Sequence, residues 1–105
     1  MIKMKFRQGD LMFERIDKAP KGRKRRRKDN IILRGEATGH AHRLKGGELF
    51  EVWGGESGLY IEVKTKGEVV HEEHAPIELE KGLYRVIRQR EYSPGEESGT
   101  EFVVD

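Results

Sequence analysis

The chain has 105 residues, of which 34% are hydrophobic and 38% are charged, with a formal net charge of +2 and no cysteine. This length predicts one domain, residues 1–105, with a modest core. The lack of cysteine excludes a disulfide framework and a thiolate metal site. No segment approaches the roughly eighteen consecutive apolar residues of a membrane span, so we expect no membrane partner and a cytoplasmic protein.

Short apolar runs, rich in β-branched and aromatic residues and separated by glycine or proline, predict strands at roughly ten-residue spacing. In chain order they cover 2–6, 10–16, 30–34, 40–44, 48–53, 59–65, 68–71, 76–79, 83–92 and 101–105. Turns are expected at 46–47, 54–58, 66–67, 81–82 and 93–95. No window sustains a helical period, so the pattern predicts an all-β fold, a barrel or sandwich of about 8–10 short strands.

The segment from Lys18 to Lys28 holds eight basic residues and no acidic one. Removing those eight from the 21 basic residues of the chain leaves 13 against 19 acidic ones, so an acidic body carries one basic segment. Like charges repel, which predicts a mobile basic loop over residues 17–29. It could attract nucleic acid, dock an acidic partner, or serve only solubility. The residues expected to bind nucleic acid here are Arg23, Lys24, Arg25, Arg26, Arg27 and Lys28.

All four histidines stand in two close pairs, His40 with His42 and His71 with His74. On a strand the first pair would share one face, about 6.6 Å apart along the chain. A turn or bulge at residues 72–73 could bring the second pair to one side. Imidazole is a common ligand of zinc, iron and nickel, so the pairs predict one divalent transition-metal site. Its ligands would be four histidines, or three with a carboxylate from Glu36, Glu48, Glu72 or Glu73.

The same pairs allow a site without metal. One histidine of each pair could act as general base and the other as general acid in a ribonuclease, with Arg43, Arg88 or Arg90 holding the phosphate. Arg88 and Arg90 share a predicted strand face with two tyrosines, an arrangement that suits bases and phosphates. A solvated face paired with glutamates is the structural alternative, and purely structural histidines are a further one.

The stretch "GEATGHAHRLKGGELFEVWGG" resembles the first motif of the cupin superfamily, in which a glycine precedes an HxH pair and a glutamate and a second glycine follow. Here those places fall on Gly35, His40, His42, Glu48 and Gly54. The resemblance implies a small β-barrel in which His40, His42 and Glu48 are the metal ligands. The second cupin motif, a late histidine after a PxG turn, is not found in order.

The chain is also similar to small, functionally uncharacterised proteins of bacteria and their phages. The stretches that carry this likeness are "RQGDLMF", "GEATGHAHR", "HEEHAPIEL" and "GLYRVIRQREYSP". The likeness implies that these stretches belong to one unit, and it brings no activity.

Three functions follow from the sequence, in this order. The first is a cupin-like metal-binding protein, a metal-dependent hydrolase or oxygenase if its site reacts. The second is a non-enzymatic nucleic-acid or protein-binding module that uses the basic segment, and the third is the metal-independent ribonuclease. An edge strand such as 101–105 could also pair with a second copy, so the sequence allows a homodimer.

Overall fold

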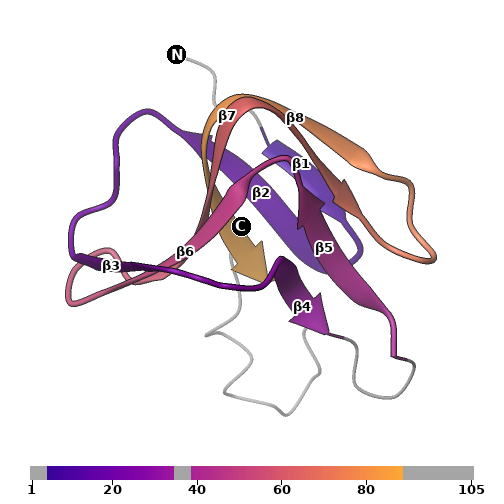
Figure 1. The fold of residues 1–105 in the computed structure, drawn as a ribbon, viewed down its shortest axis with the longest axis horizontal. Helices are drawn as coiled ribbons and strands as arrows, with labels where there is room; N and C mark the ends of the chain where they lie inside the picture. Colours follow the sequence, from indigo (N-terminus) through magenta and orange to yellow (C-terminus); the bar gives the residue numbers. More distant parts are fainter. Residues whose placement is uncertain (1–4, 35–38, 89–105) are drawn as a thin grey trace, which may run out of the picture.

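A computed structural model describes residues 5–34 and 39–88, which fold into antiparallel strands with no helix among them (Figure 1). The eight strands are β1 (Lys5–Gln8), β2 (Leu11–Ile16), β3 (Arg23–Arg26), β4 (Ile31–Arg34), β5 (Ala41–Lys45), β6 (Glu48–Trp53), β7 (Gly58–Val70) and β8 (Ile77–Arg88). The all-β prediction is confirmed, but the strands form one sheet that does not close into a barrel. The predicted strand 101–105 lies outside the described residues. Within the described ranges, no helix has the length and apolarity to cross a membrane.

The sheet forks at β7. Its main path runs β1-β2-β8-β7-β5-β4, while β6 pairs with another part of β7 and carries β3 on its far side. The first half of β7 pairs with β6, from Val52 opposite Gly58 to Glu48 opposite Glu62, and its last three residues pair with β5. The consecutive strands β5 and β6 therefore pair with two separate stretches of the same edge of β7. β4 continues the sheet beyond β5, and β3 continues it beyond β6.

Two turns expected from the sequence are wrong, because Lys66-Gly67 and Lys81-Gly82 lie inside the continuous strands β7 and β8. The pairing register shifts between Val63 and Lys66, which is where an irregularity bends the long hairpin. At Gly82 the φ angle is 151°, and a Cβ there would lie 2.9 Å from Nε of Arg15. Both glycines thus mark places where another group comes close to a strand rather than where the chain reverses.

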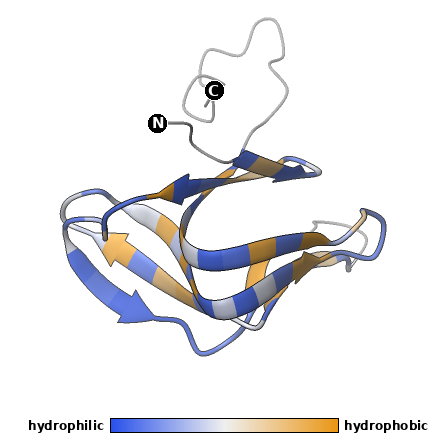
Figure 2. Cartoon of the chain, turned by 90° about the horizontal axis from the view of Figure 1, so that it is seen from above, coloured by the Kyte–Doolittle hydropathy of each residue, from blue (hydrophilic) through white to orange (hydrophobic). Residues whose placement is uncertain are grey.

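The core lies on one face of the curved sheet and draws on both branches of the fork. Figure 2 shows bands of hydrophobic and hydrophilic residues along the long strands, as in β8, whereas β3 is hydrophilic throughout. The buried cluster consists of Leu11, Phe13, Ile32, Leu44, Leu49, Ile61, Val63, Val69, Leu79 and Tyr84. This single cluster fits the modest core expected of the composition.

The basic segment holds a strand where a loop was expected. Arg23–Arg26 form β3, which pairs with β6 and exposes all four side chains. Acidic residues relieve the repulsion, because Arg25 contacts Glu51 at 3.3 Å and Arg26 contacts Glu48 at 2.8 Å. The centre of residues 17–29 is therefore an edge strand, held by main-chain pairing and by ion pairs to its neighbour.

Candidate metal centre

The four histidines meet around one cavity, which lies where the β1–β2 turn, the start of β5 and the β7–β8 connection come together (right-hand side of Figure 1). The ring centres of His42 and His71 are 4.3 Å apart, those of His71 and His74 are 4.7 Å apart, and those of His40 and His71 are 5.7 Å apart. The cavity has a volume of about 360 Å³. Two pairs that are thirty residues apart in the chain are thus neighbours in space, as predicted.

Gln8, at the end of β1, fixes the orientation of the His42 ring. Its amide nitrogen donates to the carbonyl oxygens of Val69 at 3.1 Å and Ala75 at 2.8 Å. Since carbonyl oxygens only accept, the amide oxygen of Gln8 must face Nδ1 of His42, which lies 2.8 Å away. Nδ1 of His42 therefore carries a proton and donates, which leaves Nε2 as the lone-pair nitrogen when the ring is neutral.

His42 is kept neutral by its surroundings. Its side chain is buried, and this burial, with the nearby imidazoles of His71 and His74, lowers the pKa of His42 from 6.5 to about 4. A neutral imidazole whose second nitrogen donates to a fixed acceptor is the state in which histidine binds transition metals. Among the histidines, His42 is thus the one most completely prepared to act as a ligand.

The neutral His71 ring carries its proton on the other nitrogen. Its Nδ1 accepts a hydrogen bond from the main-chain N–H of Glu73 at 3.0 Å, so its Nε2 carries the proton in the neutral ring. Binding a metal through Nε2 would require the ring to give up this hydrogen bond. Without metal, His42 offers a proton acceptor and His71 a proton donor in one cavity, which is the pair that general acid–base catalysis uses.

Among the described residues, Asp10, Glu72 and Glu73 bring carboxylates to the histidines, whereas Glu48 does not. One oxygen of Glu72 accepts the N–H of Ala41 at 3.0 Å and the other accepts from Arg43 at 3.1 Å. The hydrogen bond from Ala41, together with Arg43, lowers the pKa of Glu72 to about 2, so it is anionic at neutral pH. Potential ligand atoms of His40, His71 and Glu72 all lie within 4.8 Å of one another.

Glu73 also reaches this site, with its Oε2 3.5 Å from Nδ1 of His40. Glu48, by contrast, begins β6 and forms its ion pair with Arg26 on β3. It does not line the histidine cavity. The ligand set that the cupin resemblance implies, His40, His42 and Glu48, is therefore not brought together, and Glu72 is the carboxylate that lies with the histidines.

The arginines expected to bind nucleic acid are divided between two places. Arg88 lines the histidine cavity, and Arg43 borders it through Glu72. Arg23 to Arg26 lie on β3, followed by Arg27 and Lys28, while Arg90 lies outside the described residues. The structure thus does not join these residues into one surface.

Gln8, Asp10 and Arg34 also belong to the site, although no sequence motif points to them. The stretch from Gln8 to Asp10 reads only as a turn, and nothing in its spacing refers to residues sixty positions away. One signal was available, since side-chain amides are rare in this chain and a glutamine at a strand end needs a partner. Gly9, with a φ of 62°, allows the close approach, because a Cβ there would lie 2.9 Å from Nε2 of His74.

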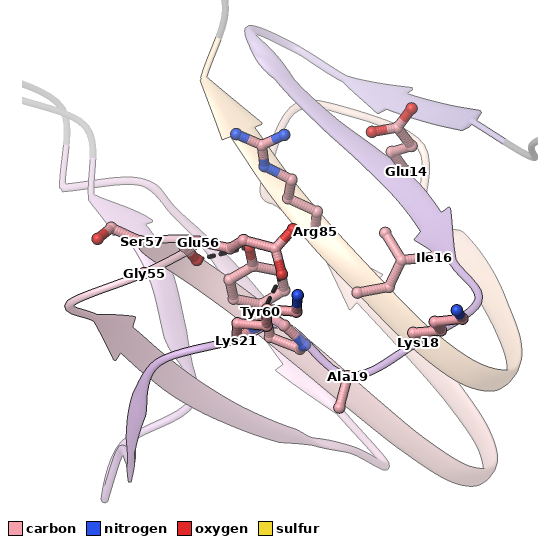
Figure 3. A pocket seen from close by; sticks show the side chains of 11 residues that line it. Glu14, Ile16, Lys18, Ala19, Lys21, Gly55, Glu56, Ser57, Tyr60 and Arg85 are labelled. Atoms are coloured by element: carbon pink, nitrogen blue, oxygen red, sulfur yellow. Dashed lines mark hydrogen bonds between the residues drawn. The ribbon is translucent and has the colours of Figure 1, made fainter.

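A second, larger cavity of about 630 Å³ lies between the Lys18–Lys21 segment and the strands β2, β7 and β8. Figure 3 shows Arg85, Tyr60 and Lys21 around it, with Glu56 accepting from the N–H of Lys21 at 2.7 Å. The hydroxyl of Tyr60 donates to the carbonyl oxygen of Glu56 at 2.8 Å. Since the groups joined here satisfy one another, this cavity offers no ligand set comparable to the histidines.

Comparison with known proteins adds a family but no activity. The model of a family described as a domain of unknown function, DUF8820, matches residues 7–89. No curated protein matches the chain, and no solved structure matches it.

Proposed function

Because the chain belongs to the DUF8820 family of domains of unknown function, we propose its function from the site itself: the protein binds a divalent transition metal through its histidine cluster. His40, His42, His71 and His74 would supply nitrogen ligands and Glu72 a carboxylate oxygen. The observation that carries the proposal is the hydrogen bond from His42 to Gln8, which presents an unprotonated nitrogen next to three further imidazoles.

The chemistry of the donors favours zinc, iron or nickel over magnesium or calcium. Imidazole nitrogen suits the transition metals, whereas calcium and magnesium prefer oxygen ligands throughout. The amide of Gln8 is itself fixed by Val69 and Ala75, so the ring it holds cannot turn freely. Such support beyond the ligands is typical of metal sites in proteins.

We further propose that the site reacts, as a hydrolase or an oxygenase would. A structural metal site is closed by four protein ligands, whereas a catalytic one keeps a position for water or substrate. The cavity of about 360 Å³ beside the histidines provides such room. A bound divalent ion would supply Lewis acidity there, and Glu72 would balance one of its two positive charges.

Metal analysis of protein purified without a histidine tag tests the proposal. The protein is stripped with EDTA, supplied in turn with zinc, iron(II), nickel and cobalt, desalted, and analysed for bound metal. We expect about one equivalent of metal per chain. A content below about a tenth of an equivalent for every metal would refute the proposal.

Two glutamates provide a matched control. Glu72→Gln removes a carboxylate next to the histidines and is expected to weaken metal binding, as is His71→Asn. Glu48→Gln removes the carboxylate that pairs with Arg26 instead, and it is expected to leave metal binding unchanged. Equal effects of the two glutamate variants would contradict the assignment of Glu72.

A second candidate, the binding of single-stranded nucleic acid, is favoured by the surroundings of β3. Trp53 is 44% exposed and stands opposite Arg23 in the β3–β6 pairing. Within the described ranges, neither Arg23 nor Lys24 forms an ion pair. An exposed aromatic ring beside free cations can stack a base and hold its phosphates.

Tryptophan fluorescence tests this candidate, because Trp53 is the only tryptophan of the chain. Titration with a single-stranded RNA should quench the emission, more strongly at low salt than at high salt. A variant with Arg23→Gln and Lys24→Gln should bind more weakly than one with Lys64→Gln and Lys81→Gln, which removes the same charge elsewhere. Equal binding by both variants would refute a role for β3.

A further inference from the structure

Arg88 lines the histidine cavity and has a buried nitrogen that forms no hydrogen bond. It is the last described residue of β8 and pairs with Leu11 of β2, which places it beside the β1–β2 turn. In the described part of the chain, its Nε is the one buried side-chain nitrogen or oxygen without a hydrogen-bond partner. Burying a polar group without a partner costs roughly 1–3 kcal/mol, so this donor needs an explanation, such as a bound water, ion or ligand.

Asp10 does not satisfy this donor. Its Oδ2 lies 3.5 Å from Nε of Arg88, close enough for an ion pair but not for a well-formed hydrogen bond. Asp10 and Arg88 both line the cavity, and 35% of the Arg88 side chain is exposed, so a group in the cavity can reach this side chain. Arg34, the last residue of β4, lines the same cavity and adds a second guanidinium.

The charged residues around the cavity predict the sign of the charge on a ligand that would bind there. Among the residues that line the cavity, Arg34 and Arg88 are balanced by Asp10 and Glu73. A divalent ion bound at the histidines would therefore leave the lined cavity with excess positive charge. Guanidinium groups bind oxyanions through paired, charge-assisted hydrogen bonds.

We propose that the histidine cavity binds a ligand with an oxyanion group, a phosphate or a carboxylate, held by Arg88 and Arg34 next to the metal. This inference rests on the proposed metal site, since the metal supplies the excess positive charge. It assigns Arg88 to substrate binding at that site rather than to a separate nucleic-acid surface.

Calorimetric titration tests the inference, with inorganic phosphate and acetate as probes in separate experiments on the cobalt-loaded, desalted protein. We expect at least one probe to bind, and the stronger one identifies the class of oxyanion. Arg88→Gln should weaken its binding by roughly ten- to hundred-fold while the cobalt content stays the same. Arg85→Gln is the matched control, because Arg85 lies on the same strand but lines the second cavity (Figure 3).

The outcomes separate the inference from the proposed function. Cobalt bound without any phosphate or acetate binding, or with binding that Arg88→Gln leaves intact, overturns the inference alone. Equal losses in Arg88→Gln and Arg85→Gln overturn it too, since they would reflect overall charge. A protein that takes up no metal overturns the proposed function, and this inference with it.

Discussion

Burial of a neutral His42 should make the stability of the protein depend on pH in a defined window. In the unfolded chain this histidine titrates near 6.5, whereas in the folded protein its pKa is about 4. Between these values the unfolded chain binds more protons than the folded one. The free energy of unfolding therefore has its full value above pH 6.5 and falls as the pH drops toward 4.

The size of the effect follows from the shift. Each pKa unit corresponds to about 1.4 kcal/mol, so His42 accounts for about 3 kcal/mol in total and about 2 kcal/mol between pH 7 and pH 5. Glu72, with its pKa lowered to about 2, titrates well below this window. His71 and His74 add to the lowering of the His42 pKa, and Asp10 and Glu72 oppose it.

Urea unfolding of the wild type and of His42→Asn, in EDTA at several pH values from 7.5 to 4.5, measures the effect. Asparagine can keep the donor that faces Gln8 but cannot titrate. The wild type should lose about 2 kcal/mol more than the variant between pH 7 and pH 5. Parallel stability curves for the two proteins would show that His42 protonates in the folded state, and the reasoning from its burial would be wrong.

Three further predictions concern the support of the site, the fork and the alternative chemistry. Gln8→Leu, checked for folding by circular dichroism, should weaken metal binding by about 10–100-fold in an equilibrium titration, because it removes the acceptor that orients a ligand. Gly46→Ala should lower the free energy of unfolding in urea by at least about 1 kcal/mol more than Gly54→Ala does. Both glycines have φ near 80°, but only at Gly46 would a Cβ meet a carbonyl oxygen, that of Lys66, at 2.5 Å. RNA incubated with the protein in EDTA should stay intact on a gel, and cleavage that His42→Asn abolishes would favour the metal-free ribonuclease instead.

The sequence predicts the strands well where apolar and polar residues clearly alternate. It predicts them poorly at glycines, which occur both in turns and inside bent strands. At Gly67 and Gly82 the residue type is the same as in a true turn such as Gly46-Gly47. Only the neighbours, Lys45 of β5 beside Gly67 and Arg15 of β2 beside Gly82, distinguish a bent strand from a turn, and both contacts are tertiary. β3 was not predicted for a related reason, because a run of arginine and lysine has little intrinsic strand preference. It becomes a strand through main-chain hydrogen bonds and ion pairs with β6.

The candidate site, too, could be predicted from the sequence only in part. Pairing of all histidines in HxH and HxxH was visible in the chain, and it sufficed to predict that they share one site. The partners that give the rings their roles were not visible, because Gln8 and Arg88 reach the cavity through strand pairing and sheet curvature. Glu48 was chosen by its place in a motif, whereas the structure gives the corresponding position near the histidines to Glu72.

The hydrogen bonds of Gln8 also bear on how the protein is made. They join residues 61 and 67 positions apart in the chain, at Val69 and Ala75. During synthesis the first strand would leave the ribosome long before its acceptors exist, so the imidazoles of a nascent chain lack their arrangement. Under the proposed function, metal would enter the site only after the chain has been synthesised as far as Ala75 and has folded.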